Sequence, residues 1–352
     1  MNMPSNLGSG GLAPKDVSGL TLTYGDRVDL LEQMVAGLCR EGVGHLMVLA
    51  NGLKAEPLAR LHALARDTTV RGLSMTILES PENLGSAAGF GRLLSAARSV
   101  GTVKAVWFMD DDNLPCPGAL AALLAVQAMH PGAAVSAVRR DRSYLVRAAR
   151  TGIAPDPAPG VAFSMDLGRR PRNLWRRLTR GSPVPAPTPP AAVPIARVPY
   201  GGLLVPRALM EMVAPPREDF VLYADDYEYS ERLGAAGGLF LAGAAEVEDL
   251  EASWNATGKR TPTLPQSQLV RLATMPADFR LYYSLRNALV LDRNRARGMA
   301  ILPFVLNLTV LVMAGCTHAF ARGRSANAQV ILQAVRDGVS GRLGRSPDFP
   351  LP

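Results

Sequence analysis

Short β-prone segments alternate with segments of helical periodicity through the first 140 of the 352 residues. We predict strands at residues 19–24, 45–50, 69–78, 103–109 and 133–139, and helices at 28–39, 56–66, 86–100 and 118–129. Strands that alternate with helices at this spacing form a mostly parallel sheet with helices on both faces. Because ligands of such sheets bind at the carboxyl ends of the strands, the loops after the strands hold the candidate functional residues.

The composition narrows the class of protein. With 48% hydrophobic residues, the chain can bury a large core as one elaborated domain or two. A net charge of +8 favours anionic partners: nucleic acid, nucleotide phosphates, phospholipid or a pyrophosphate-linked substrate. Three widely spaced cysteines indicate neither a disulfide framework nor a zinc cluster, and they fit a reducing cytoplasm. The Gly/Ser/Pro-rich start lacks the features of a signal peptide.

Three consecutive aspartates, Asp110, Asp111 and Asp112, follow the apolar run at 105–109. Adjacent like charges are unfavourable unless solvent or a cation screens them, and Mg²⁺ and Mn²⁺ prefer carboxylate oxygens. A divalent metal site is therefore one interpretation. An exposed acidic turn is the other, because Asp-Asn-Leu-Pro at 112–115 also favours turns.

Two further loops, at 24–27 and 79–86, should open onto the same edge of the sheet as the aspartates. The second loop leads into glycines at 85, 89 and 91, and a helix that starts there would offer free backbone N–H groups to a phosphate. The order of these glycines matches neither a Walker nor a Rossmann motif. Tight packing of the helix on a strand is the alternative explanation for them.

A second acidic cluster, Asp225, Asp226 and Glu228, follows another apolar run and precedes a helical pattern. A capping role at the start of that helix explains one aspartate. It does not explain three carboxylates together, because clustered carboxylates require a cation or a role in proton transfer.

These segments together resemble the family 2 glycosyltransferases with a GT-A fold, especially the rhamnosyl- and galactofuranosyltransferase-like members. The resemblance spans about residues 19–290, and its motifs are Thr-Tyr-Gly-Asp-Arg at 23–27, Asn-Leu-Gly at 83–85, Gly89-Phe90, and Trp-Phe-Met-Asp-Asp-Asp at 107–112 with Pro115 behind it. In combination they are far more specific than any one of them. The resemblance implies a GT-A-type α/β fold, with a mostly parallel central sheet, helices on both faces and a C-terminal helical region.

The resemblance also implies roles for residues on the donor side. Asp110 and Asp112 match the D-x-D carboxylates that hold Mg²⁺ or Mn²⁺ on the diphosphate of a nucleotide sugar. Asp249 stands where many relatives have a metal-binding His, and it could be an oxygen ligand in its place. The donor-binding residues would be Thr23, Tyr24, Asp26, Arg27, Asn51, Asn83, Gly85 and Asp111.

On the acceptor side, the resemblance implies that Gly201 and Gly202 shape the acceptor site, together with Glu228. It gives the role of general base to Asp226, with Asp225 as the alternative. A helix N-terminus would lower the pKa of this base, whereas desolvation would raise it. Arg286 lies in a segment at 279–288 that resembles one near the family's substrate site, and it either contacts a diphosphate or covers a helix surface.

The expected function is an inverting, metal-dependent transfer of rhamnose, galactofuranose or a similar sugar from a UDP- or dTDP-sugar to a glycan or lipid-linked acceptor, in cell-surface polysaccharide synthesis. A sugar-nucleotide pyrophosphorylase is one alternative, but residues 21–27 lack the Gly-rich, Lys/Arg-containing loop that it needs after the first strand. An inactive glycosyltransferase-like binding protein is the other alternative, because the expected His is missing.

Two segments indicate contact with the cytoplasmic face of a membrane. Residues 169–180 combine Trp175 and Leu178 with many arginines, which suits a membrane surface or a solvated basic loop. Nucleic-acid binding is not expected, because no RNP, zinc-finger or helix-turn-helix motif accompanies the charge. The 18-residue uncharged run at 299–316 could span a membrane, lie on it or be buried in the protein.

The patterns divide the chain into five parts. We predict a flexible tail at 1–17, a nucleotide-sugar-binding α/β half at 18–140 and a Pro/Arg-rich loop region at 141–197. We also predict an acceptor and catalytic half at 198–257 and a C-terminal helical region at 258–352.

Overall fold

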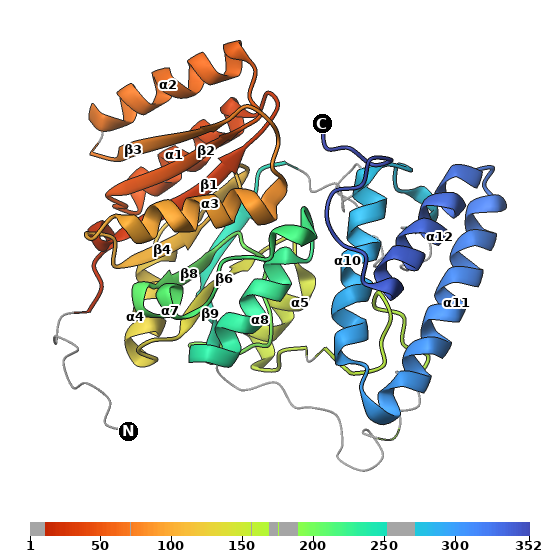
Figure 1. The fold of residues 1–352 in the computed structure, drawn as a ribbon. Helices are drawn as coiled ribbons and strands as arrows, with labels where there is room; N and C mark the ends of the chain where they lie inside the picture. The colour runs from red at the N-terminus through yellow and green to blue at the C-terminus, as the bar shows by residue number, and fades with distance from the viewer. Residues whose placement is uncertain (1–10, 71, 156, 169–174, 176–188, 252–271) are drawn as a thin grey trace.

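The computed structural model describes residues 11–70, 72–155, 157–168, 175, 189–251 and 272–352. An α/β part with a nine-stranded sheet lies beside a group of C-terminal helices (Figure 1). The strands are β1 (Val17–Thr23), β2 (His45–Asn51), β3 (Ser74–Ser80), β4 (Ala105–Phe108), β5 (Asn113–Pro115), β6 (Ala134–Arg139), β7 (Ala192–Pro194), β8 (Leu203–Pro206) and β9 (Leu239–Asp249). The helices are α1 (Val28–Arg40), α2 (Ala55–Val70), α3 (Gly85–Ser99), α4 (Ala119–Met129), α5 (Ser143–Thr151), α7 (Arg207–Met212), α8 (Asp225–Gly237), α10 (Phe279–Arg295), α11 (Ile301–Phe320) and α12 (Ser325–Ser340).

The sheet is mostly parallel. Its order is β3-β2-β1-β4-β8-β6-β9-β5, and β7 pairs with β9. Strands β1, β2, β3, β4, β6 and β9 run in one direction, whereas β8, β5 and β7 pair antiparallel with their neighbours. The predicted fold class, a mostly parallel sheet with helices on both faces and a C-terminal helical region, is therefore confirmed.

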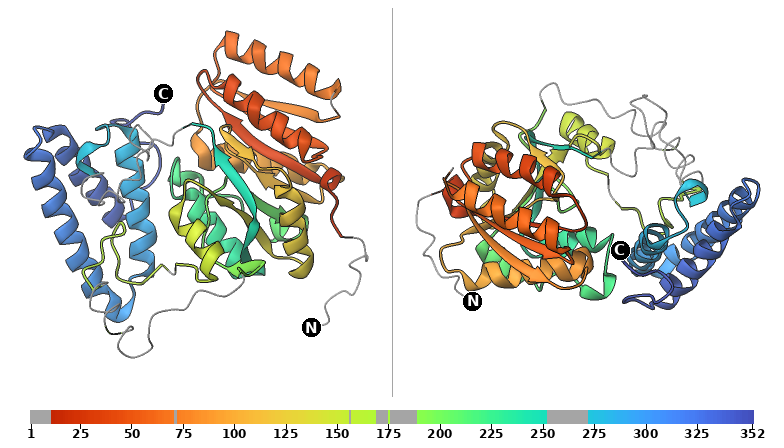
Figure 2. Two further views of the ribbon diagram at one scale, coloured as in Figure 1. Left: turned by 180° about the vertical axis from the view of Figure 1, so that it is seen from behind. Right: turned by 90° about the horizontal axis from the view of Figure 1, so that it is seen from above.

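Both faces of the sheet are buried under helices (Figure 2). In β4, Val106 and Phe108 face the core under α3, α5, α7 and α8, whereas Ala105 and Trp107 face the core under α1, α2 and α4. A strand that is buried on both sides needs apolar residues at every position, which explains the continuous apolar run before the aspartates.

Several element boundaries differ from the prediction. The third strand was expected at 69–78, but α2 continues through Val70 and β3 begins at Ser74. The β-branched residues of this region belong to the last turn of the helix, where Thr68 donates its hydroxyl to the carbonyl of Ala65. The first strand begins at Val17, inside the expected tail, after a 3-10 turn at Pro14–Asp16.

The C-terminal helices form a further core cluster, which includes Tyr282, Leu285 and Ile331 and also Ala162 and Val221. Residues 341–352 then return toward the sheet, so that the end of the chain lies near α3 and α10 (Figure 1). Phe349 stacks on Tyr282 with ring centroids 4.3 Å apart, and the backbone carbonyl of Pro352 accepts a hydrogen bond from Asn83 Nδ2 at 3.1 Å.

The described residues contain one helix that is long and apolar enough to cross a membrane, Gly298–Phe320. Only 22% of the 18-residue apolar segment within this helix is buried in the protein. It is therefore not a core helix, although one such helix is weak support for a membrane span.

Candidate functional site

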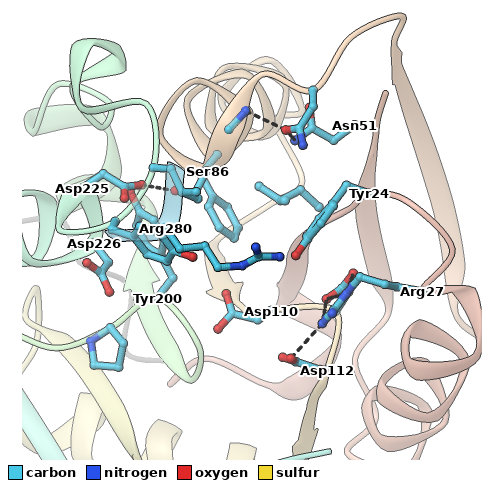
Figure 3. A pocket seen from close by; sticks show the side chains of 18 of the residues that line it. Tyr24, Arg27, Asn51, Ser86, Asp110, Asp112, Tyr200, Asp225, Asp226 and Arg280 are labelled. Carbon is cyan, nitrogen blue, oxygen red and sulfur yellow. Dashed lines mark hydrogen bonds and ion pairs between the residues drawn. The ribbon is translucent and has the colours of Figure 1, made fainter. Parts of the chain in front are cut away.

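A cavity of about 390 Å³ opens at the carboxyl ends of β1, β2, β3 and β4 (Figure 3). The first turns of α8 and α10 and the end of the chain form its other walls. The cavity therefore lies at the sheet edge where the alternating pattern predicted a ligand site.

Eleven of the predicted site residues line this one cavity. They are Tyr24, Arg27, Asn51, Asn83, Gly85, Asp110, Asp111, Asp112, Asp225, Asp226 and Asp249. They come from loops that are far apart in the sequence, so the convergence of the two acidic clusters is a property of the fold. Figure 3 shows the two clusters on opposite sides of the cavity, with Asp226 on one side and Asp112 on the other.

Arg27 holds two of the three consecutive aspartates. Its Nε and Nη2 donate to both carboxylate oxygens of Asp111 at 2.9–3.1 Å, and Nη2 also donates to Asp112 at 2.8 Å. The guanidinium lies 5.3 Å from the ring centroid of Tyr24. Asp111 is nearly inaccessible, so the exposed acidic turn, the alternative interpretation, does not fit this residue.

Arg139, the last residue of β6, holds the other carboxylates. Its Nη1 donates to Asp110 at 2.8 Å and its Nη2 donates to Asp249 at 2.7 Å. Asp249 is next to the aspartate run because it pairs with Asn113 in the β5–β9 ladder. Its other oxygen, Oδ1, is buried and has no hydrogen-bond partner among the described residues.

The carboxylates match the chemistry of a hard divalent cation, because Asp110, Asp112 and Asp249 present oxygen atoms to one cavity. The unpartnered oxygen of Asp249 also fits a cation. Each of these aspartates is paired with an arginine, however, and the described residues contain no group of three or more acidic, His or Cys side chains close enough to hold a metal ion.

The second acidic cluster begins helix α8, and both aspartates line the cavity, Asp225 buried and Asp226 half-buried. Burial raises the pKa of both carboxyl groups, and the charge of Asp226 raises that of Asp225 further. Ser86 Oγ donates to Asp225 at 2.8 Å, and the backbone N–H of Tyr227 donates to Asp226 at 2.8 Å. The pair is therefore suited to accepting a proton near neutral pH.

The turn before α8 is strained. Val221, Tyr223 and Ala224 have φ values of 66°, 66° and 61°, a region that L-residues rarely adopt. Asn287 holds this turn, because its Nδ2 donates to the carbonyls of Phe220, Leu222 and Tyr223 at 2.7–2.9 Å.

Arg286 does not contact the cavity, so its predicted role at the substrate site is not supported. Its side chain is buried, with 1% of its surface exposed. It donates to the backbone carbonyl of Gly344 at 2.7 Å and to that of Phe220 at 3.3 Å. The guanidinium instead ties α10 to the turn before α8 and to the C-terminal segment, because buried carbonyls need hydrogen-bond donors.

Three N–H groups at the N-terminus of α3, where free N–H groups were expected for a phosphate site, already have partners. Asn51 Oδ1 accepts from the N–H of Leu84 at 2.7 Å, and Asn83 Oδ1 accepts from that of Gly85 at 3.0 Å. The N–H of Ala87 donates to the carbonyl of Val221 at 3.2 Å. A Cβ at Gly85 would overlap that same carbonyl, so close packing accounts for this glycine.

The remaining predicted residues lie around the cavity but do not line it. Thr23 is buried beneath it, Asp26 pairs with Arg60, and Glu228 pairs with Arg232 one turn further along α8. A Cβ at Gly201 would overlap Asn113 and crowd Arg139, so this glycine makes room for the arginine that holds Asp110. Gly202, with φ +97°, packs against Ala137 of β6 and Val247 of β9.

Several lining residues were not predicted, among them Arg139, Arg142, Glu251, Arg280 and Leu351. Arg139 could have been predicted, because it is the last residue of the predicted strand at 133–139 and ligands of such sheets bind at the carboxyl ends of the strands. No local signal points to Arg280 or Leu351, because the packing of the C-terminal helices brings them to the sheet.

The cavity is strongly acidic although the chain is basic. Seven carboxylates line it, Asp110, Asp111, Asp112, Asp225, Asp226, Asp249 and Glu251, against the four guanidinium groups of Arg27, Arg139, Arg142 and Arg280. Seven negative and four positive charges give a formal charge of −3 when all groups are ionised. An anionic ligand would be repelled from such a cavity unless a cation accompanied it or some carboxylates were protonated.

No protein-family model matches the sequence, and no curated protein sequence matches it. Among solved structures, the chain is similar to the mannosyltransferase PcManGT from Pyrobaculum calidifontis in complex with GDP-Man and Mn²⁺, at 15% identity and a TM-score of 0.49, over 97% of this chain and 81% of that chain. It is similar to residues 1–349 of TarS from S. aureus at 11% identity and a TM-score of 0.43, over 92% and 91% of the two chains. A third similar structure is GalNAc-T7 with UDP, GalNAc and Mn²⁺, at 12% identity and a TM-score of 0.48, over 86% of this chain and 57% of that chain.

Proposed function

We propose that this chain is an inverting, metal-dependent glycosyltransferase that moves a sugar from a UDP- or dTDP-sugar to a glycan or lipid-linked acceptor. The observation that carries the proposal is the cavity itself, in which two separate carboxylate clusters face each other across a space at the carboxyl edge of a parallel sheet. One cluster suits a cation and the other suits proton transfer, and a glycosyl transfer from a diphosphate needs both.

The excess of negative charge supports the need for a cation. A nucleoside diphosphate is itself anionic, so a cavity whose ionised groups sum to −3 favours its entry together with a cation. Asp110, Asp112 and Asp249 would hold Mg²⁺ or Mn²⁺, whose charge stabilises the departing diphosphate.

Asp226 is the proposed base, with Asp225 as the alternative. The base takes the proton of an acceptor hydroxyl while that oxygen bonds to the anomeric carbon and the bond from this carbon to the diphosphate breaks. Attack from the side opposite the leaving group inverts the configuration. The position of Asp226 across the cavity from Asp112 supports this division of roles.

The first test is slow hydrolysis of a nucleotide sugar by the purified protein with Mg²⁺ or Mn²⁺. A panel that includes dTDP-rhamnose and UDP-galactose in both ring forms would identify the donor. We expect Asp112→Ala to abolish the hydrolysis, because it removes a cation ligand. The exposed Asp29, outside the cavity, supplies the control variant Asp29→Ala, which should keep full activity.

Equal activity in Asp112→Ala and wild type, with circular dichroism showing both folded, would refute the proposal. Conversion of a sugar 1-phosphate and a nucleoside triphosphate would identify a pyrophosphorylase instead. Binding of a nucleotide sugar without any turnover would identify a binding protein.

We also propose that the enzyme works at the cytoplasmic face of a membrane, in cell-surface polysaccharide synthesis. Helix α11 supports the membrane contact, because it buries Phe304, Leu311 and Ala319 but exposes Leu302, Leu306 and other apolar side chains. Exposed arginines flank it at 293, 297, 322 and 324, and they suit anionic lipid headgroups. The basic segment at 169–180 lies outside the described residues apart from Trp175.

A further inference from the structure

Arg280 lies in the first turn of α10, and its side chain extends into the cavity between Tyr24 and Asp110 (Figure 3). We propose that Arg280 binds the diphosphate of the sugar donor. The inference rests on the proposed function and adds a residue, contributed by the C-terminal helices, that recognises the anionic part of the substrate.

One edge of the Arg280 guanidinium is held by a neighbour and the other is open. Nη1 donates to Asp278 Oδ2 at 2.6 Å, while Asp278 Oδ1 caps the helix by accepting from the N–H of Arg280 at 2.8 Å. Nε and Nη2 have no hydrogen-bond partner among the described residues. This edge of a guanidinium binds two oxygens of one phosphate side by side.

The other arginines of the cavity already hold carboxylates. Arg27 donates to Asp111 and Asp112, and Arg139 donates to Asp110 and Asp249. Arg142 forms an ion pair with Asp141 at 3.1 Å, although its buried Nε has no hydrogen-bond partner among the described residues. Arg280 is preferred to Arg142 because its guanidinium extends into the cavity between Tyr24 and Asp110 with the Nε–Nη2 edge open.

Two contacts orient the Arg280 side chain in the absence of a ligand. Asp278 fixes the guanidinium as described above, and the ring of Phe279, which also lines the cavity, lies 4.5 Å from it. Such preorganisation lowers the entropy cost of binding, because few rotamers remain to be lost. Asp278 is therefore a positioning residue for Arg280.

The test compares ligands that differ only in phosphate content. Calorimetry with Mn²⁺ would first compare UDP, dTDP and GDP with wild type to choose the nucleobase. It would then measure the affinity of the diphosphate, the monophosphate and the nucleoside, for example UDP, UMP and uridine, for wild type, Arg280→Gln and Arg280→Lys. We expect Arg280→Gln to weaken diphosphate binding by about tenfold or more, because it removes a charge-assisted pair of hydrogen bonds. The effect should be smaller for the monophosphate and absent for the nucleoside, and Arg280→Lys should recover part of the loss.

Arg293 supplies the matched control, because it is exposed on the same helix and does not line the cavity. Arg293→Gln should bind all three ligands as wild type does. An unchanged diphosphate affinity in Arg280→Gln would overturn the inference. An equal loss for diphosphate and nucleoside would also overturn it, because it would indicate a purely structural role. If wild type binds none of the three diphosphates, the proposed function itself fails.

Discussion

The two carboxyl groups at the start of α8 are the residues whose protonation should control catalysis. Asp225 is buried and Asp226 is half-buried, and desolvation raises the pKa of both above the usual aspartate value of about 3.9. Hydrogen bonds from backbone N–H groups at the start of the helix lower the pKa, but desolvation has the larger effect on both carboxyl groups. Carboxylates in this state are stronger bases than exposed ones, at the cost of being protonated over more of the acidic range.

Activity should therefore rise with pH, and this rising limb of the pH–rate profile should lie well above pH 4. A base accepts a proton only when it is ionised, so a raised pKa shifts the rising limb to higher pH. The rate of sugar transfer or donor hydrolysis, measured from about pH 5 to 9, gives this limb directly. We expect Asp226→Asn to lower kcat by about 10²–10⁴-fold at all pH values.

Asp225→Asn is the matched control, because it changes the adjacent carboxyl group in the same way. It should keep a larger part of the activity and leave the limb near its wild-type position, because Asp225 has the higher pKa of the two and is already protonated where Asp226 titrates. The reverse ranking of the two variants would give the role of base to Asp225. A rate with a limb near pH 4 in wild type would contradict the raised pKa.

At the scale of the element, α11 is the helix whose environment the sequence left open. The structure does not fit the buried alternative, because only 22% of its apolar segment is buried. One stripe packs against the neighbouring helices, and the rest of the surface, including Ile301, Leu302, Val305 and Leu306, does not. An exposed apolar surface of this kind, flanked by arginines, favours an interface with lipid.

We expect the double variant Leu302→Glu/Leu306→Glu to lose binding to vesicles of mixed anionic and zwitterionic phospholipid. The affinity should fall by about tenfold or more, because each leucine contributes about 1.5–3 kcal/mol when it leaves water. Cosedimentation with vesicles measures the bound fraction. Met212 is exposed on α7, in the sheet part of the molecule, so Met212→Glu is the control that should bind as wild type does. Equal binding of the double variant would exclude α11 as the lipid contact.

At the scale of the whole molecule, the cavity joins the sheet to the C-terminal helices. Arg280, Leu351 and Pro352 line it together with the strand-end loops. The end of the chain is held there by the stack of Phe349 on Tyr282 and by the hydrogen bond that the Ser346 N–H donates to the Tyr283 phenol oxygen at 2.9 Å. The segment therefore acts as one wall of the candidate donor site.

Deletion of residues 347–352 should weaken binding of a nucleoside diphosphate by about tenfold. The deletion removes the apolar wall next to Asn83 and exposes that end of the cavity to water. Calorimetry with UDP and Mn²⁺ measures the change, and the melting temperature shows whether the fold is retained. Asp348→Ala removes only a surface contact with Gln333 and should bind as wild type does. Tighter binding by the shortened chain would mean that the segment obstructs the cavity.

Local patterns were sufficient for the sheet and for the position of the site. Periodicity depends on residues a few positions apart, so it predicted the alternation of strands and helices and the loops that meet at one edge. The two aspartate clusters and Asp249 could be predicted as members of one site on the same basis, together with the resemblance. Boundaries such as that of α2 and β3 could not, because Thr68 is buried in the last turns of α2 although threonine favours strands.

The sequence by itself determined that a mostly parallel sheet would bring carboxylates to its carboxyl edge, because strand period and strand polarity are local properties. Only the tertiary structure decided which groups those carboxylates contact. Arg27 contacts Asp111, which is 84 residues away in the sequence, and Arg139 contacts Asp249, which is 110 residues away. Local sequence patterns do not predict contacts at such separations. The same packing buries Arg286 against backbone carbonyls and turns Arg280, less than two helical turns earlier, into the cavity.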